Sequence, residues 1–235
     1  MAPHEVVFLL DVDNTLLDND AVIEDLKRHL IDACGVECQR RYWELFEQLR
    51  EELGYADYLG ALQRYRVEHP RDPHLLGVSL FLLHYPFADR LYPDVLRVLQ
   101  RLRSLGPTVI LSDGDVVFQP RKVEHAGIAR VADGDVLIYI HKEEALDDVE
   151  RRFPAEHYVL VDDKLRILDA VKQVWGERVT TVFPRQGQYA HDAKVISALP
   201  PADVTIERIG DLLDLDLTRL GTTLSTLVSS QKVRR

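Results

Sequence analysis

Two aspartates and a threonine directly follow a short apolar run near the start of the chain, in the sequence VVFLLDVDNT. An enzyme that transfers a phosphoryl group to an aspartate needs one carboxylate as nucleophile, held in line with phosphorus. It also needs a second carboxyl group, which protonates the leaving oxygen and later activates water. Asp11 and Asp13 supply both groups on one short turn, which we expect Thr15 to tie down. A solvated turn at a strand end accounts for the same residues, so this segment alone leaves both interpretations open.

Two later segments place polar residues in comparable positions. Ser112 ends the apolar run TVILS and Asp113 follows it. A hydroxyl with free backbone N–H groups suits a phosphate oxygen, although an ST-turn or a helix cap would use the same residues. Lys142 follows the run VLIYI at the start of an expected helix, where an ammonium group can neutralise both a phosphate and a carboxylate. Lys122 is a rival for this role, but it lies inside another expected helix.

A pair of carboxylates closes a fourth apolar run, HYVLVDD. Asp162 and Asp163 would repel each other and Asp11 strongly unless a cation joined them. Such oxygen ligands suit Mg²⁺, with waters, a substrate phosphate and the backbone carbonyl of Asp13 completing its shell. Four segments with complementary groups favour phosphoryl chemistry more strongly than any one of them does alone.

Strands and helices must alternate to bring these residues together. Continuous apolar runs do alternate with segments of helical period, which predicts an α/β fold whose parallel sheet is covered on both faces. Ligands bind at the carboxyl ends of the strands in such sheets. The expected strands are 6–10, 108–112, 136–140, 157–163, 179–183 and, more weakly, 203–207, and the expected helices are 92–106, 119–128, 142–153 and 164–176.

Residues 18–90 break this alternation with four segments of helical spacing, each with Gly or Pro near its end. We expect a helical cap domain over residues 18–90, inserted into a core of residues 1–17 and 91–235. Cations and aromatic residues on the insert are candidate substrate contacts, although an amphipathic helix with Tyr42 or Trp43, Leu45, Phe46 and Leu49 inward explains several of them. The candidates are Arg40, Arg41, Tyr42, Tyr55, Tyr58, Arg64 and Tyr65, with Phe118, Gln119, Arg121 and the loop 183–191 on the core side.

Composition narrows the classes of function. The chain has 235 residues, of which 46% are hydrophobic, and a formal net charge of −10, which argues against broad binding to nucleic acids or anionic membranes. No segment approaches the ~20 apolar residues of a membrane span, and no basic region precedes the first apolar run as in a signal peptide. Cys34 and Cys38 are four residues apart in an expected helix, and we expect reduced, half-buried thiols in a soluble, cytoplasmic protein.

The ordered segments DVDNT, ILSDG, Lys142 and VDD resemble the four motifs of the haloacid dehalogenase-like (HAD) superfamily, over roughly residues 5–17 and 90–210. The resemblance implies a Rossmann-like core, a helical C1-type cap, an aspartyl-phosphate intermediate and Mg²⁺. It implies that Asp11 is the nucleophile and Asp13 the general acid/base. Ser112 and Lys142 would bind phosphate, with Asp113 beside them. The implied metal ligands are Asp11, Asp13, Asp162 and Asp163, with Asp163 as the main ligand of the fourth motif.

Three positions depart from the superfamily pattern. Asn14 stands where Gly is commonest, which is a mild change because Asn tolerates unusual turn dihedrals. Asp162 stands where many members have Gly, and it adds a charge that could bind a metal directly. Ile167 occupies the usual place of a further acidic residue, for which Asp169 is the nearest substitute.

The resemblance favours a Mg²⁺-dependent phosphomonoester hydrolase that acts on a small phosphorylated metabolite. Dehalogenases of the superfamily lack the second motif-one aspartate and need no metal, so Asp13 would be an idle charge in such an enzyme. ATPases of the superfamily would require membrane spans. A phosphomutase, a haloacid dehalogenase-type hydrolase and a non-catalytic interaction protein remain as alternatives, and the sequence leaves the substrate and the oligomeric state open.

Overall fold

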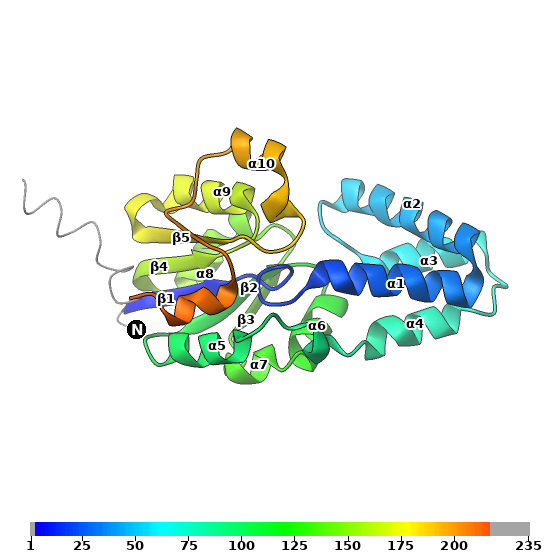
Figure 1. The fold of residues 1–235 in the computed structure, drawn as a ribbon, viewed down its shortest axis with the longest axis horizontal. Coiled ribbons are helices and arrows are strands. Elements are labelled where there is room, and N and C mark those ends of the chain that lie inside the picture. Colours follow the sequence, from blue (N-terminus) through cyan, green and yellow to red (C-terminus); the bar gives the residue numbers. More distant parts are fainter. Residues whose placement is uncertain (1–2, 217–235) are drawn as a thin grey trace, which may run out of the picture.

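A computed structural model describes residues 3–216, in which a six-stranded parallel sheet lies between two layers of helices (Figure 1). The sheet has the order β3-β2-β1-β4-β5-β6, and every neighbouring pair is parallel. The predicted α/β fold is therefore confirmed. Residues 1–2 and 217–235, which belong to the predicted core segments, lie outside the described residues. The strands are β1 His4–Leu10, β2 Thr108–Asp113, β3 Val136–Tyr139, β4 Ala155–Val161, β5 Val179–Pro184 and β6 Val204–Ile206.

The central strand β1 shows why the sheet is buried on both faces. Phe8 and Leu10 pack in one hydrophobic cluster, whereas Val7 and Leu9 pack in another on the opposite face. Because both faces of the strand are buried, all of these residues are apolar, and the strand appears in the sequence as an unbroken apolar run. Since β1 is hydrogen-bonded on both edges, to β2 and β4, the residue that follows it is held rigidly.

Helices cover the two faces in separate groups. The cluster around Phe8 and Leu10 includes residues of α5, α6 and α7, and the cluster around Val7 and Leu9 includes residues of α8 and α9. The expected helix 142–153 begins as a short 3₁₀ turn before α8. The elements are α5 Val95–Arg103, α6 Phe118–His125, α7 Ile128–Val131, η2 Lys142–Glu144, α8 Leu146–Arg152, α9 Leu165–Trp175, η3 Gly176–Arg178, η4 Tyr189–His191, α10 Ala193–Ala198 and η5 Ile209–Leu213.

A helical insert (α1–α4) lies beyond the carboxyl end of β1 (Figure 1). It consists of α1 Asn19–Cys34, α2 Val36–Leu53, α3 Tyr58–Glu68 and α4 Leu75–His84, and the 3₁₀ turn η1 Phe87–Arg90 follows it. Asp18 caps α1, because its Oδ1 accepts a hydrogen bond from the backbone N–H of Ala21 at 2.9 Å. The predicted inward face of α2 is confirmed: Tyr42, Leu45, Phe46 and Leu49 are buried.

The two chain segments that join the insert to the sheet lie side by side. The backbone N–H of Asp18 donates to the carbonyl of Arg90 at 2.8 Å, and that of Tyr92 donates to Leu16 at 3.0 Å. Leu17 and Leu91 form an antiparallel bridge between the same two segments. The insert therefore leaves and re-enters the core at a single place. Within residues 3–216, none of the helices combines the length and the apolar character needed to cross a membrane.

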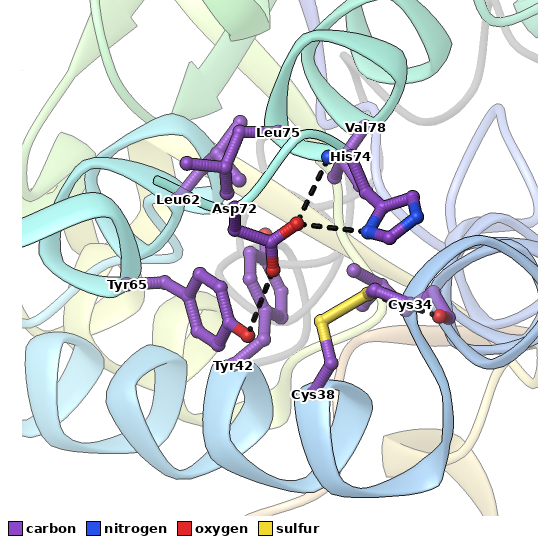
Figure 2. A pocket seen from close by; sticks show the side chains of 10 residues that line it. Cys34, Cys38, Tyr42, Leu62, Tyr65, Asp72, His74, Leu75 and Val78 are labelled. Carbon is purple, nitrogen blue, oxygen red and sulfur yellow. Dashed lines mark hydrogen bonds and ion pairs between the residues drawn. A yellow bond between two sulfur atoms is a disulfide. The ribbon is translucent and has the colours of Figure 1, made fainter. Parts of the chain in front are cut away.

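A small pocket lies at the outer end of the insert, where α1, α2 and α3 meet the segment before α4 (Figure 2). Asp72 organises its polar side: Tyr65 Oη donates to Asp72 Oδ2 at 3.3 Å, and His74 Nδ1 lies 2.8 Å from Asp72 Oδ1. The remaining lining is largely apolar and includes Leu62 and Val78. Tyr65, a candidate substrate contact, thus has its hydroxyl group in the packing of the insert.

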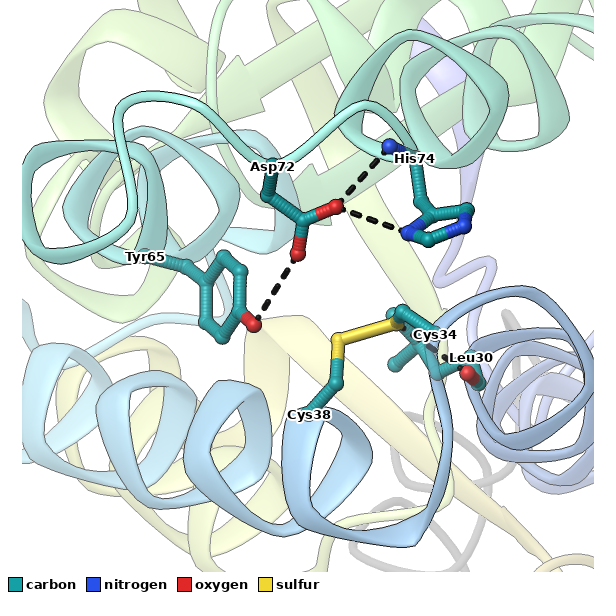
Figure 3. Close-up of a disulfide and its surroundings, with 6 residues drawn as sticks. All are labelled: Leu30, Cys34, Cys38, Tyr65, Asp72 and His74. Atoms are coloured by element: carbon teal, nitrogen blue, oxygen red, sulfur yellow. Dashed lines mark hydrogen bonds and ion pairs between the residues drawn. A yellow bond between two sulfur atoms is a disulfide. The ribbon is translucent and has the colours of Figure 1, made fainter.

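The expectation of reduced thiols is wrong for this structure. Cys34 and Cys38 form a disulfide that joins the end of α1 to the first turn of α2 (Figure 3). They do not belong to one continuous helix, because Gly35 adopts a φ of 89° between α1 and α2 and reverses the chain. This turn brings the two Cα atoms to 5.7 Å, within the usual range for a disulfide.

Reducing the disulfide is expected to lower the free energy of unfolding only modestly, because the bond closes a loop with three residues between the cysteines. Loop-closure entropy predicts about 2 kcal/mol for so short a loop. Urea unfolding with and without a thiol reductant measures the difference. The double substitution Cys34→Ser and Cys38→Ser should reproduce the effect of the reductant and abolish any further response to it. A reductant effect that persists in the double variant would contradict this assignment.

Candidate active site at the strand ends

Four of the predicted segments meet at the carboxyl ends of adjacent strands. Asp11 follows β1, Ser112 lies near the end of β2, Lys142 follows β3, and Asp162 and Asp163 follow β4. The strand order β3-β2-β1-β4 makes these ends neighbours. Carboxylate oxygens of Asp11, Asp162 and Asp163 lie within 4.8 Å of one another, and all three residues are buried. The sheet topology alone thus gathers residues that are up to 152 positions apart in the sequence, from Asp11 to Asp163.

Lys142 is a buried cation in contact with this cluster. Its Nζ lies 2.5 Å from Asp11 Oδ1 and 2.6 Å from Asp162 Oδ2. Burial lowers the pKa of Lys142, but the charges of Asp11 and Asp162 outweigh burial and hold the pKa above its usual value. The ammonium group is therefore charged. Asp113 Oδ1 accepts a hydrogen bond from the backbone N–H of Lys142 at 2.8 Å, so Asp113 fixes the turn that carries the lysine.

The three carboxylates carry more negative charge than Lys142 and the nearby Lys164 together neutralise. Burial raises the pKa of Asp162 and that of Asp163, and the charge of Asp11 adds to both increases. Among the described residues, Asp11 Oδ2 and both carboxylate oxygens of Asp163 are buried without a hydrogen-bond partner. Unpartnered oxygens on clustered carboxylates are what a hard divalent cation binds. The donor set therefore fits Mg²⁺.

The turn after β1 is held by its own polar side chains. Asn14 adopts a φ of 60°, in keeping with the expected tolerance of Asn for this region. Its Oδ1 accepts hydrogen bonds from the backbone N–H groups of Asn19 and Asp20, at 3.0 and 3.2 Å. Thr15 ties the turn to the next strand, because its Oγ1 accepts from the backbone N–H of Asp163 at 3.1 Å. The turn is thus connected both to β4 and to the start of the insert.

Ser112 faces Asp11, with Ser112 Oγ 3.5 Å from Asp11 Oδ1. Gln119 Nε2 donates to the same hydroxyl at 2.9 Å and sets its orientation. Phe118, at the start of α6, is buried, and Arg121 donates to the carbonyl of Leu83 in the insert. Of the residues on α6 that were expected to line the site, Gln119 does contact it through Ser112, whereas Arg121 contacts the insert instead.

Asp13 lies apart from the carboxylate cluster and pairs with a different lysine. Both of its carboxylate oxygens accept hydrogen bonds from Lys122 Nζ, at 2.7 and 2.9 Å. The position of Lys122 inside a helix is as expected, but the side of α6 that it occupies is buried and faces the turn after β1. Lys122 was a rival of Lys142 in the sequence, whereas in the structure Lys122 pairs with Asp13 and Lys142 pairs with Asp11 and Asp162.

Two residues of the insert reach the strand ends. Tyr58, one of the candidates, is buried, and its ring centroid lies 5.3 Å from that of Phe118 at the start of the core helix α6. Arg50, which was not among the candidates, donates to Tyr189 Oη in the loop after β5. The sequence does contain a sign of this contact. Arg50 lies four and eight residues after the buried Phe46 and Tyr42, so it continues the inward face of α2.

The other candidates on the insert have partners within it. Arg40 and Arg41 pair with glutamates of α2 and α3, and Arg64 pairs with Glu52. Tyr42 Oη donates to the backbone carbonyl of Tyr58 at 2.8 Å, and Tyr55 is partly exposed.

The loop 183–191 lies against the turn after β1, as expected. Gln186 Nε2 donates to the carbonyl of Thr15 at 3.1 Å, and the backbone N–H of Gln188 donates to Asp20 Oδ2 at 2.7 Å. His191 is exposed. On α9, Ile167 is buried in the core. The partly exposed Asp169 accepts from Gln173 Nε2 and is outside the carboxylate cluster.

The haloacid dehalogenase-like hydrolase family matches residues 6–174 of the chain. A solved structure assigned to the same hydrolases, from Burkholderia xenovorans LB400, is 62% identical to this chain and superposes with a TM-score of 0.88. That match covers 92% of this chain and 98% of the other. The chain belongs to the haloacid dehalogenase-like hydrolases.

More distant structures share the fold of this HAD-like hydrolase. An L-2-haloacid dehalogenase from Xanthobacter autotrophicus with chloropropionic acid covalently bound is 17% identical, with a TM-score of 0.59, and the match covers 89% of this chain and 97% of that one. A HAD hydrolase from Bacillus subtilis bound to magnesium is 15% identical, with a TM-score of 0.58, over 91% and 98% of the two chains. A comparison with curated proteins found no match.

Proposed function

We propose that this HAD-like hydrolase is a Mg²⁺-dependent phosphatase that cleaves a small phosphorylated metabolite in the cytoplasm. The observation that carries the proposal is the group of unpartnered buried oxygens on Asp11 and Asp163. A divalent cation would compensate these oxygens, and a phosphate group would bring oxygens of its own to that cation. Dehalogenases of the superfamily use no metal, so the cluster favours a phosphatase over a dehalogenase.

In the proposed first step, an oxygen of Asp11 attacks phosphorus and the bond from phosphorus to the leaving oxygen breaks. Asp13 gives its proton to the leaving oxygen, which departs as an alcohol. Lys142 holds the attacking carboxylate in place, and the Ser112 hydroxyl binds a phosphate oxygen.

In the second step, Asp13 takes a proton from a water molecule whose oxygen attacks phosphorus. The bond to Asp11 breaks, and inorganic phosphate and free Asp11 result. Asp11, Asp162 and Asp163 would hold Mg²⁺, with the backbone carbonyl of Asp13 as a further ligand. When bound, the ion supplies positive charge that neutralises the phosphate and the carboxylates.

We propose that the helical insert, residues 18–90, acts as a cap domain. The core that it covers is formed by residues 1–17 and 91–235. Support for the cap comes from Tyr58, whose ring packs against Phe118 of α6, and from Arg50, which donates to Tyr189 in the loop after β5. A cap that excludes water would favour phosphoryl transfer to a second alcohol, whereas one that admits water would favour hydrolysis.

The metal requirement gives a direct test. We expect the purified protein with Mg²⁺ to release phosphate from at least one member of a panel of sugar phosphates, nucleotides and phospho-acids. EDTA should suppress release by at least about 100-fold, because the buried carboxylates would be left uncompensated, and added Mg²⁺ should restore it.

The same preparation should be assayed for chloride release from L-2-chloropropionate in EDTA. Chloride release without phosphate release would favour a metal-independent dehalogenase and contradict the proposal. Failure of both reactions would favour a non-catalytic interaction protein. Transfer of phosphate between two alcohols of a substrate, without free phosphate, would identify a phosphomutase.

A further inference from the structure

Lys122 is a fully buried lysine that the proposed steps leave without a role. It lies on α6, with Nζ 5.5 Å from the ring centroid of Phe118 and 6.0 Å from that of Tyr58. Burial of an ammonium group between aromatic rings is costly unless hydrogen-bond acceptors and an opposite charge compensate for lost hydration. The partners of Lys122 therefore indicate what the residue does.

Three acceptors surround Lys122 Nζ. Two are the oxygens of Asp13, at 2.7 and 2.9 Å, and the third is Asn19 Oδ1, at 3.1 Å. An ammonium group has three N–H donors, so these contacts satisfy all of them. A cation that contacts both oxygens of a carboxylate restrains its rotation as well as its position.

We propose that Lys122 is a positioning residue that fixes the carboxyl group of Asp13 for proton transfer. Asp13 lies on a turn beyond β1, and its side chain is 23% exposed, so packing alone leaves it room to rotate. A general acid or base must lie within hydrogen-bond reach of the oxygen it serves, and small displacements cost large factors in rate. The inference rests on the proposed function, which makes Asp13 the acid/base.

The same contacts link Asp13 to the helical insert. Asn19 is the first residue of α1 and Tyr58 is the first residue of α3, so one side of Lys122 is covered by the insert. Lys122 itself belongs to the core helix α6. The placement of Asp13 thus depends on the insert being docked against the core.

Leaving-group dependence is the readout that separates positioning from a general loss of structure. An alkyl phosphate needs a proton on its leaving oxygen, whereas p-nitrophenyl phosphate releases a stable phenolate without one. We expect Lys122→Met to lower kcat by about 100-fold for the alkyl phosphate that wild type cleaves best, and by less than about 10-fold for p-nitrophenyl phosphate. KM should change by less than about threefold for both substrates, because Lys122 contacts Asp13 rather than the substrate.

A double-mutant cycle tests whether Lys122 acts through Asp13. With the alkyl phosphate, Asp13→Asn combined with Lys122→Met should be no slower than Asp13→Asn alone. Lys27→Met is the matched control, since Lys27 pairs with Glu24 on the surface of α1, and it should leave kcat unchanged. If Lys122→Met does not fold, Asn19→Ala removes one acceptor and should show a smaller loss with the same leaving-group dependence.

Equal losses of kcat for the two substrates would overturn the inference, and so would losses that multiply in the double variant. Both results leave the proposed phosphatase intact, because they concern only how Asp13 is held. A wild-type protein that cleaves no phosphomonoester would instead reject the proposed function, and with it the acid/base role on which the inference depends.

Discussion

Replacing Asp11 with Asn is expected to lower kcat by at least about 1,000-fold for every phosphomonoester that the wild-type protein cleaves. The amide keeps the shape of the side chain but cannot act as the nucleophile. Phosphate release at matched protein concentration measures the effect. The variant should fold, because the substitution removes one of three clustered carboxylates and so reduces their mutual repulsion.

Asp169→Asn is the matched control for this substitution. Asp169 is also an aspartate, but it is partly exposed on α9 and outside the carboxylate cluster, so kcat should stay within about twofold of wild type. Circular dichroism and urea unfolding of both variants check that each is folded. Turnover near the wild-type level in Asp11→Asn would show that the reaction does not pass through an aspartyl-phosphate on this residue.

Replacing Lys142 with Met is expected to lower the free energy of unfolding by about 3–5 kcal/mol when measured in EDTA. The substitution leaves the buried carboxylates of Asp11 and Asp162 without the cation that both contact. Urea unfolding of the wild type and the variant gives the difference. Added Mg²⁺ should reduce the deficit, because a bound divalent ion would replace part of the missing positive charge.

Lys172→Met provides the comparison for Lys142→Met. Lys172 pairs with Asp203 at 2.8 Å near the sheet edge, and both side chains are partly exposed, so its loss should cost less than about 1 kcal/mol. A loss below about 1 kcal/mol for Lys142→Met in EDTA would mean that the buried carboxylates are compensated in another way. A deficit that does not change with Mg²⁺ would argue against metal binding at Asp11 and Asp163.

The strands and their polar ends could be predicted because a buried parallel strand leaves an unambiguous trace. VVFLL and the VIL of TVILS are apolar throughout, since both faces of the sheet are covered, and the first polar residue after each of them, Asp11 or Ser112, marks the sheet edge. Strand adjacency then brings Asp11, Ser112 and Asp163 together without any further information. The position of Lys142 at this edge of the sheet was predicted in the same way, because it follows the apolar run VLIYI.

Helical residues were harder to place, because a helix can turn any of its sides toward a neighbour. Lys122 sits among polar residues in QPRK, and only the docking of the insert against α6 makes its surroundings buried. Arg50 is one of several charged residues in the sequence of α2, yet it donates a hydrogen bond to Tyr189, which is 139 residues away in the sequence. Asp113 was expected near phosphate, but its carboxylate accepts from the backbone of Lys142.

The prediction of reduced cysteines was wrong because of the local path of the chain. Their spacing suggested one helix, although Gly35 lies between them at the end of the first helical segment of the insert, and the reversal of the chain at its φ of 89° was not anticipated. Glycine at such a position ends a helix as readily as it is tolerated inside one, and the spacing of the apolar residues does not distinguish the two.

The paired segments at Asp18–Arg90 and Leu17–Leu91 have an evolutionary consequence. Because the insert begins and ends at neighbouring points, it can be lengthened, shortened or exchanged for an unrelated module without altering the path of any strand. The helical insert and the sheet that carries the proposed catalytic residues can then diversify at different rates. Lys122 limits this freedom, since any replacement module would still have to supply a residue that covers it.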